Sequence, residues 1–194
     1  MILLMENAIL PEGEVSPEAR RLLDAALELI RHGGTRSRPR VADIVAEAGL
    51  SNDAFYRHFP SKDDLVAALI TDGARRLARH LAHQMGREDT AEGQVRRWAE
   101  GILSQARGET GAATVAVQWN SERVKTNQHD ASETLAGLLR GPFADLGSDT
   151  PELDASLTAH AVVGTLAACL ARREPPDQAD TERIVAFCLR AASR

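Results

Sequence analysis

The sequence predicts an all-α protein of about nine helices, and three observations support this fold class. Apolar residues recur at helical spacing from residue 16 almost to the end, and no segment shows the strict alternation of a strand. Glycine and proline stand mostly between these periodic segments, where helices end and begin. With 194 residues, of which 43% are hydrophobic and 26% charged, the chain has the composition of a globular protein.

The first predicted helix follows residues 1–15, which we expect to form a flexible arm. Ser16 can cap this helix with its hydroxyl, Pro17 follows in the first turn, and Gly33 and Gly34 end the helix. Its buried stripe comprises Leu22, Ala26, Leu29 and Ile30.

Two short helices joined by a glycine turn come next. The first has one apolar face, formed by Val41, Ile44, Val45 and Ala48. Gly49 ends it, and Ser51 can cap a second helix in which Phe55 and Phe59 lie one turn apart. This arrangement predicts a helix-turn-helix.

The outward face of the second short helix has side chains that suit a DNA major groove. If Phe55 and Phe59 point into the core, the residues that point outward are Asp53, Ala54, Tyr56 and Arg57, flanked by Asn52 and His58. Tyrosine, arginine, asparagine and histidine can all bond to phosphates or base edges.

Charge along the chain supports this interpretation, although the net charge is -5. Residues 31–62 hold six basic and three acidic residues, a balance of +3, whereas residues 1–30 and 63–194 each have a balance of -4. Because the local field governs contact with phosphates, an acidic remainder is compatible with DNA binding.

The rest of the chain is predicted to be helical. A long helix runs from Ser61 to about Gly86, with a stripe formed by Leu65, Leu69, Gly73, Leu77, Leu81 and Met85. Further helices are expected near residues 90–107, 110–124, 130–146, 151–173 and 178–192, and Gly141 and Pro142 should kink the third of these.

The motif residues resemble those of the TetR family of bacterial transcription regulators. The resemblance covers residues 17–70 and depends on Gly49-Leu50-Ser51, Phe55-Tyr56-Arg57-His58-Phe59 and Ser61-Lys62-Asp63-Asp64-Leu65. It implies a homodimer that binds a palindromic DNA operator and that a small-molecule effector releases. The implied parts are a helix-turn-helix DNA-binding domain over 16–62 and an effector-binding and dimerisation domain over 63–194.

The resemblance also implies roles for individual residues. Tyr56 and His58 would contact phosphates, and Lys62 would do so from the start of the next helix. Arg57 is the candidate for reading a base, while Asp53 either pairs with Arg57 or accepts a bond from a cytosine amino group. The complete predicted DNA-binding set is Arg38, Arg40, Ser51, Asn52, Asp53, Ala54, Tyr56, Arg57, His58 and Lys62.

The chain departs from the family pattern before the first short helix. Where members often have a threonine cap and a basic residue soon after it, this chain has Arg38-Pro39-Arg40 and Ala42. Arg38 and Arg40 could substitute as phosphate contacts, and a solvated basic loop is the other interpretation.

Two tryptophans in the body have two interpretations. Trp98 and Trp119 lie near the amides Gln105, Gln118 and Asn120, and they could line an effector pocket. The further candidates for its wall are Met85, Gln118, His129 and Phe143. The alternative is that both tryptophans belong to the core, with their indole N–H groups bonded to the amides.

The last two helices have more apolar surface than one core face needs, which predicts self-association. The expected interface residues are Ala161, Gly164, Thr165, Ala168, Ile184, Phe187 and Cys188. The alternative is burial of these residues inside a monomer.

Other functional classes find little support in the sequence. His80 and His83 lie at i, i+3 without a third ligand nearby, so we expect a solvated face and no metal. We expect no cofactor and no enzyme, because neither a glycine-rich phosphate loop nor GxSxG is present. No run approaches 18 apolar residues and no secretory leader is recognisable, so we expect a cytoplasmic protein without a membrane partner. The rival hypothesis is a helical small-molecule-binding or enzymatic protein that retains the motif only as a scaffold.

Overall fold

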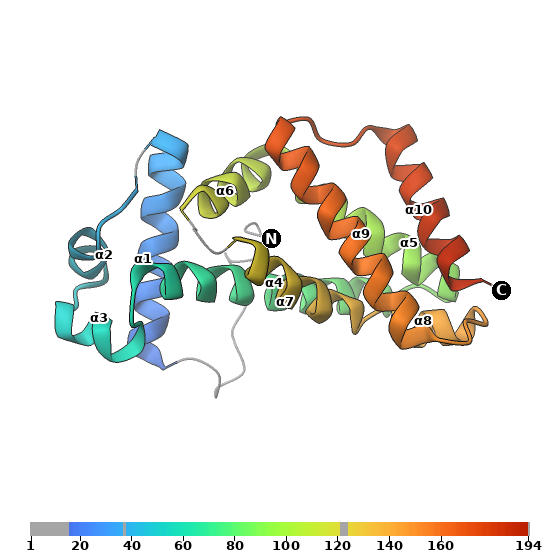
Figure 1. Ribbon diagram of the computed structural model, residues 1–194, viewed down its shortest axis with the longest axis horizontal. Coiled ribbons are helices and arrows are strands. Elements are labelled where there is room, and N and C mark those ends of the chain that lie inside the picture. Colours follow the sequence, from blue (N-terminus) through green and yellow to red (C-terminus); the bar gives the residue numbers. More distant parts are fainter. Residues whose placement is uncertain (1–15, 37, 121–123, 194) are drawn as a thin grey trace.

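The computed structural model describes residues 16–36, 38–120 and 124–193, except for the side chains of 118, 124–128 and 130. This part of the chain is all helical, with ten α-helices and one 3-10 turn (Figure 1). The elements are α1 (Pro17–Gly33), η2 (Gly34–Arg36), α2 (Val41–Ala48), α3 (Asn52–His58), α4 (Lys62–Met85), α5 (Ala91–Ser104), α6 (Gly108–Trp119), α7 (Val124–Ala136), α8 (Arg140–Asp145), α9 (Pro151–Arg172) and α10 (Gln178–Ala192). The predicted fold class is confirmed.

Hydroxyl caps set the starts of three helices in and around the helix-turn-helix. The Ser16 hydroxyl accepts the Ala19 N–H at 3.2 Å and so begins α1. Ser51 does the same for α3, and Ser61 for α4. Each bond satisfies a backbone donor that the first turn of a helix leaves without a partner, so these starts could be predicted from the sequence.

One predicted helix is wrong in its extent. Instead of a single kinked helix over 130–146, the chain forms α7, which ends at Ala136, and α8, which begins at Arg140. Pro142 has no N–H to donate, and its ring would clash with the carbonyl four residues earlier in a continuous helix. The helix therefore stops before the proline, and the count of α-helices rises from about nine to ten.

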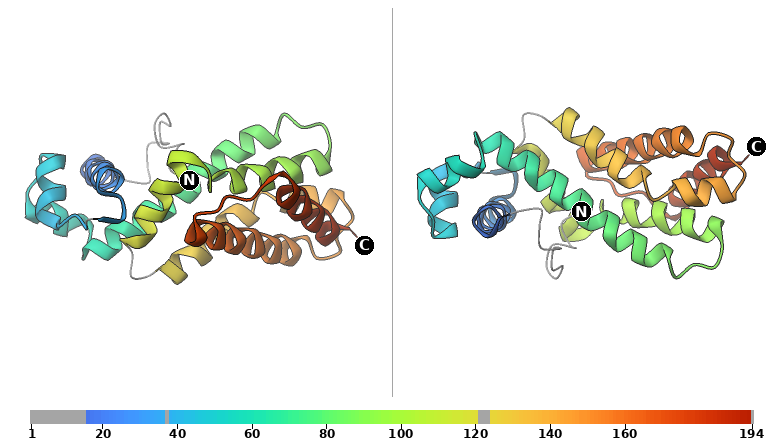
Figure 2. Two further views of the ribbon diagram at one scale, coloured as in Figure 1. Left: turned by 90° about the horizontal axis from the view of Figure 1, so that it is seen from above. Right: turned by 90° about the horizontal axis from the view of Figure 1, so that it is seen from below.

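Two hydrophobic cores lie along the molecule, and α4 contributes to both. Figures 1 and 2 show α4 running from the helix-turn-helix into the rest of the chain. The first half of α4, from Leu65 to Ile70, packs with α1, α2 and α3. The second half, from Leu77 to Met85, packs with α5 and with α7 to α10. Because one continuous helix enters both cores, no linker separates them, and the boundary at residue 62 stays a prediction.

The body also reaches the first core through α6. Three of its residues, Ala113, Ala116 and Val117, are buried together with α1. The α1 helix is thus held by α6 as well as by α4, and the three-helix motif cannot shift on the body without disturbing this packing.

A buried ion-pair network joins α1 to the middle of α4. Arg20 donates two hydrogen bonds to the Asp72 carboxylate, at 2.8 and 3.0 Å. Arg76 lies one turn further along α4, with its Nε 3.0 Å from Asp72 Oδ2. Burial alone would raise the pKa of the Asp72 carboxyl, but the bonds from Arg20 and the charges of Arg20 and Arg76 lower it below its usual value.

Helix α9 has one face in the core and another outside it. It is the one described helix long and apolar enough to cross a membrane by length and composition, and 44% of its most apolar window is buried inside the protein. Buried residues such as Ala155, Ala159 and Val162 pack in the body core. Leu153 and Leu157 are exposed. Helix α9 is therefore apolar on two faces, one packed in the body core and one exposed.

Substitution of Gly49, in the turn between α2 and α3, tests whether this turn requires glycine. Gly49 has φ +61°, and a Cβ there would lie 3.1 Å from the Arg21 side chain, which donates to the Gly49 carbonyl. Gly49→Ala should lower the free energy of unfolding by about 1–2 kcal/mol, because the left-handed conformation is strained for alanine. Urea denaturation measures this change.

The matched control is Gly141→Ala, since that position lacks a positive φ and has no atom within 4 Å of an added Cβ. Its stability should be unchanged or slightly raised. Equal losses for the two variants would contradict the assigned role of Gly49.

Candidate nucleic-acid interface

The exposed face of α3 is the centre of the candidate interface. Asn52, Asp53, Tyr56 and Arg57 are exposed, whereas Phe55 is buried in the core of the three-helix motif. Tyr56 is 58% exposed although its ring packs edge-on against Phe55. A large aromatic side chain held in this way on an otherwise polar face is available to a partner molecule.

The prediction for Ala54 is wrong, because this residue is only 3% exposed. Helix α3 packs against both α1 and α2, so its buried arc runs from Ala54 through Phe55 to Phe59. Sequence reasoning centred the buried arc on the two phenylalanines alone. The true arc is wider and displaced toward Ala54, which leaves Asp53 and Arg57 opposite to it.

Glu18 of α1 contacts two side chains at the end of α3. Its Oε2 lies 3.1 Å from the Arg57 guanidinium and 2.9 Å from His58 Nε2. The hydrogen bond with His58 lowers the pKa of the Glu18 carboxyl, and the charge of Arg57 adds to this shift, whereas desolvation opposes it. Glu18 was not singled out in the sequence, since only the fold brings α1 to within reach of α3.

This contact corrects the expected partner of Arg57. Its ion pair is with Glu18 rather than with Asp53, which makes no ion pair within the described residues. An exposed ion pair contributes little energy, so a nucleic-acid group can displace Glu18 from Arg57. His58 is less accessible, because its side chain is 22% exposed and lies against Glu18.

Two other cationic groups extend this face. Lys62 is the first residue of α4, where the helix start has backbone N–H groups without partners in the helix. Arg40 directly precedes α2 at its N-cap, and its backbone N–H donates to the Asp43 carboxylate at 2.8 Å. The Arg40 guanidinium also contacts Asp43 and is largely exposed, so it remains available to phosphates.

Arg38 is placed differently. Its guanidinium lies 5.7 Å from the centre of the Trp119 ring, which belongs to α6 of the body. A cation over an aromatic face is attracted by the ring quadrupole. The loop before α2 therefore contacts the body, although it also leads into the helix-turn-helix.

The tryptophan positions correct the predicted effector pocket. Trp98 is fully buried and its indole N–H donates to the Leu135 carbonyl at 3.0 Å, so it is a core residue, as are Met85 and Phe143. Trp119 is 53% exposed. The side chain of Gln118 lies outside the described residues, and His129 lies on the surface.

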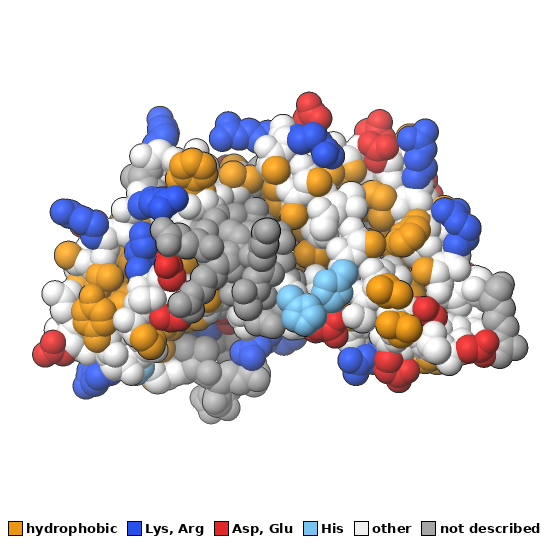
Figure 3. Space-filling model, in the orientation of Figure 1, with side chains coloured by type: hydrophobic (Ala, Val, Ile, Leu, Met, Phe, Trp, Pro, Cys, Tyr) orange, Lys and Arg blue, Asp and Glu red, His pale blue; other side chains and the backbone are white. Residues whose placement is uncertain are grey.

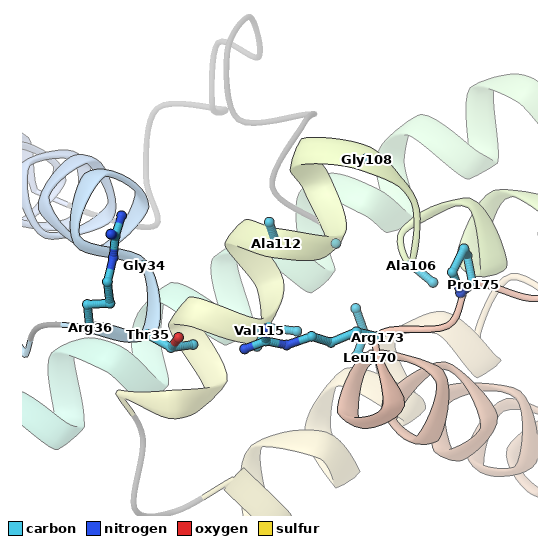
Figure 4. Close-up of a pocket in the computed structure, with 11 residues that line it drawn as sticks. Gly34, Thr35, Arg36, Ala106, Gly108, Ala112, Val115, Leu170, Arg173 and Pro175 are labelled. Atoms are coloured by element: carbon cyan, nitrogen blue, oxygen red, sulfur yellow. The ribbon is translucent and has the colours of Figure 1, made fainter.

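A pocket of about 450 Å³ lies elsewhere, between the turn after α1, helix α6 and the end of α9 (Figure 4). Arg173 extends from the end of α9 toward Val115 of α6. The apolar part of the lining includes Ala106, Ala112, Val115, Leu170 and Pro175, and Thr35, Arg36 and Arg173 are polar. None of the predicted pocket residues is among those that line it.

Helices α9 and α10 leave an apolar face uncovered, which Figure 3 shows in part along α9. Leu157 is 61% exposed, and Phe187 of α10 is also exposed. We call this surface the α9–α10 face: it comprises Leu153, Leu157, Ala161, Gly164, Thr165, Ala168, Ile184 and Phe187.

Cys188 does not belong to this face, which corrects its predicted place in a dimer interface. It is fully buried in the body core beside Val185 and Ala192. Burial raises the pKa of its thiol to about 12, so the group stays protonated at neutral pH.

Comparison with known proteins agrees with this geometry. Residues 22–69 match the model of the family described as bacterial regulatory proteins, tetR family. No curated protein matches the sequence.

Solved structures share the fold of the whole chain at low identity. The regulator RolR in complex with resorcinol is 16% identical, with a TM-score of 0.68 over 91% of this chain and 93% of that chain. The fatty acid degradation regulator FadR from Bacillus halodurans is 16% identical, with a TM-score of 0.66 over 91% and 97%. A TetR-family transcriptional regulator from Streptomyces coelicolor is 24% identical, with a TM-score of 0.57 over 90% and 92%. Residues 22–69 thus match the tetR-family model, and the chain has the fold of solved transcriptional regulators, one of which is described as a TetR-family member.

Proposed function

We propose that this protein is a TetR-family regulator, a cytoplasmic repressor that binds a palindromic operator as a homodimer and leaves it when a small molecule binds. The observation that carries the DNA-binding part is the exposed α3 face with Tyr56 and Arg57, followed by Lys62 at the start of α4. Arginine can read guanine through two hydrogen bonds, while tyrosine, lysine and helix-start N–H groups hold phosphates.

Dimerisation would place two recognition helices on one side of the duplex. The α9–α10 face offers apolar surface on two neighbouring helices, and a second copy would cover it by two-fold symmetry. Half-sites one helical turn apart need recognition helices about 34–36 Å apart, and wider sites need more. An arrangement of the two bodies that changes this separation changes operator affinity.

The pocket beside the turn after α1 is our candidate effector site. Its walls come from η2 of the DNA-binding domain and from α6 and α9 of the body, so a ligand there touches both parts. The apolar lining with Arg36 and Arg173 favours a largely apolar molecule that carries an anionic group or hydrogen-bond acceptors. Such a ligand shifts operator affinity only if it binds the two arrangements of the regulator differently.

The alternative function, a helical enzyme or binding protein that uses the motif as a scaffold, accounts less well for the α3 face. A scaffold helix needs only Phe55 and Phe59 in the core. It does not need an exposed tyrosine beside an exposed arginine, nor basic residues gathered in this segment.

Sequencing the DNA fragments that the purified protein retains from random or genomic pools tests the proposal. We expect enrichment of an inverted repeat whose half-sites reflect two-fold symmetry. Retention without any enriched motif would leave only sequence-independent binding, and no retention at low salt would support the scaffold hypothesis.

Substitutions at Arg57 and Lys62 should have different effects on the selected operator. Arg57→Ala should cost about 1–3 kcal/mol of binding free energy and relax the preference at one base of each half-site. Lys62→Ala should weaken binding to all sequences alike and lower the salt slope by about 1, because it removes a phosphate contact. Gel-shift titrations over operator variants and salt concentrations separate these effects. Equal base preferences for Arg57→Ala and wild type would contradict the role given to Arg57.

The oligomeric state tests the α9–α10 face. Leu157→Glu should convert a dimer into a monomer and abolish operator binding. By two-fold symmetry, each copy would bury one glutamate carboxylate in the apolar interface. Sedimentation velocity measures the state directly. Ala82→Glu adds the same charge at an exposed position of α4, outside this face, and should stay dimeric. A wild-type monomer at micromolar concentration would contradict the two-fold model.

A further inference from the structure

Three potential metal ligands come together on the surface where α7 meets α9. His129 and Glu133 lie one turn apart on α7, and His160 comes from α9. His129 Nδ1 is 3.0 Å from His160 Nε2, and the two ring centres are 5.1 Å apart. One ligand atom of each residue lies within 4.8 Å of the others. Figure 3 shows histidine side chains gathered at this part of the face.

Hydrogen bonds already orient two of these groups as ligands. His160 Nδ1 lies 2.8 Å from the Ser156 carbonyl oxygen, to which it donates, so in the neutral ring the lone pair is on Nε2 and faces His129. The Ser156 hydroxyl donates to Glu133 Oε1 at 2.6 Å. A ligating histidine whose other nitrogen is bonded to a carbonyl, and a carboxylate held by a donor, are typical of the surroundings of bound metals.

The donor set selects the kind of ion. Two imidazole nitrogens and one carboxylate suit zinc and neighbouring transition metals, whereas magnesium and calcium prefer oxygen donors alone. Three protein ligands leave a fourth position for water or another ligand. All three side chains are at least partly exposed, so an ion can enter without opening the core.

We propose that His129, Glu133 and His160 form a binding site for one divalent transition metal of the zinc class. The ion would link α7 to α9, two helices that already pack against each other. This site is separate from the candidate effector pocket and does not depend on the proposed DNA binding. Sequence reasoning missed it because His129 and His160 are 31 residues apart, and only the packing of α7 on α9 joins them.

Titration of the full chain with Co²⁺ tests the site, since this ion occupies zinc sites and has visible absorption bands that report its coordination. We expect one Co²⁺ per chain with the intense bands of a four-coordinate ion, and competition by Zn²⁺. Loss of an outer-shell partner typically lowers metal affinity about 10- to 100-fold, so His160→Gln, which removes a direct ligand, should lower it by at least about 100-fold. His129→Gln should do the same, and because His129 is exposed this second variant retains the fold.

The double variant His80→Gln, His83→Gln is the matched control, since these exposed histidines lie at i, i+3 on α4. It should bind Co²⁺ as the wild type does. Zn²⁺ should also raise the thermal unfolding midpoint of the wild type and of this control, but not that of His160→Gln. Equal Co²⁺ affinity in the wild type and in both single variants would overturn the proposal, as would loss of binding only in the control.

Discussion

Asp72, held between Arg20 and Arg76, joins α1 of the three-helix motif to the middle of α4. Its carboxylate is nearly excluded from solvent, and Arg20 reaches it from α1 with a two-bond contact. Removing one partner of such a buried pair leaves an uncompensated charge and typically costs about 3–5 kcal/mol. The network lies where the first core of α4 ends and the second begins, between Ile70 and Leu77. The angle of α1 on α4 is therefore fixed at the junction of the two cores.

This constraint explains how events in the body can reach α3. Helix α3 packs on α1 through the buried Phe55, and α1 is held in turn by Asp72 of α4 and by the buried alanines of α6. The candidate effector pocket lies against α6 and the turn after α1. A ligand that displaces α6 would thus move α1, and α1 would carry α3 with it. Interfaces packed at core density transmit such displacements because they deform little.

Sequence reasoning succeeded where short-range physics decides the structure. The serine caps at residues 16, 51 and 61, the glycine turn at Gly49 and the apolar stripes predicted most helix ends to within a few residues. The exposed Tyr56 and Arg57 followed from the positions of Phe55 and Phe59 on a single helix. Each of these inferences needs only neighbours within about one or two helical turns.

Apart from the helix broken near Pro142, the errors involve contacts between segments far apart in the sequence. Ala54 is buried because α3 packs on two helices, and Arg57 pairs with Glu18, which lies 39 residues away. The two tryptophans were indistinguishable in the sequence, yet one is core and the other stacks with Arg38. Cys188 and Phe187 are adjacent on α10, but only the body core decides which of them faces inward. These outcomes depend on tertiary packing, which cannot be inferred from helical periodicity.

The effect of Asp72→Asn on unfolding and operator binding tests the central claim most directly. The substitution keeps the shape of the side chain but removes the charge that two arginines share. If Asp72 fixes the DNA-binding domain on the body, thermal unfolding should separate into an early transition of α1 to α3 and a later one of the body. Operator affinity should fall, although Asp72 lies outside the candidate interface. A single transition with an unchanged midpoint, together with unchanged operator affinity, would contradict the account.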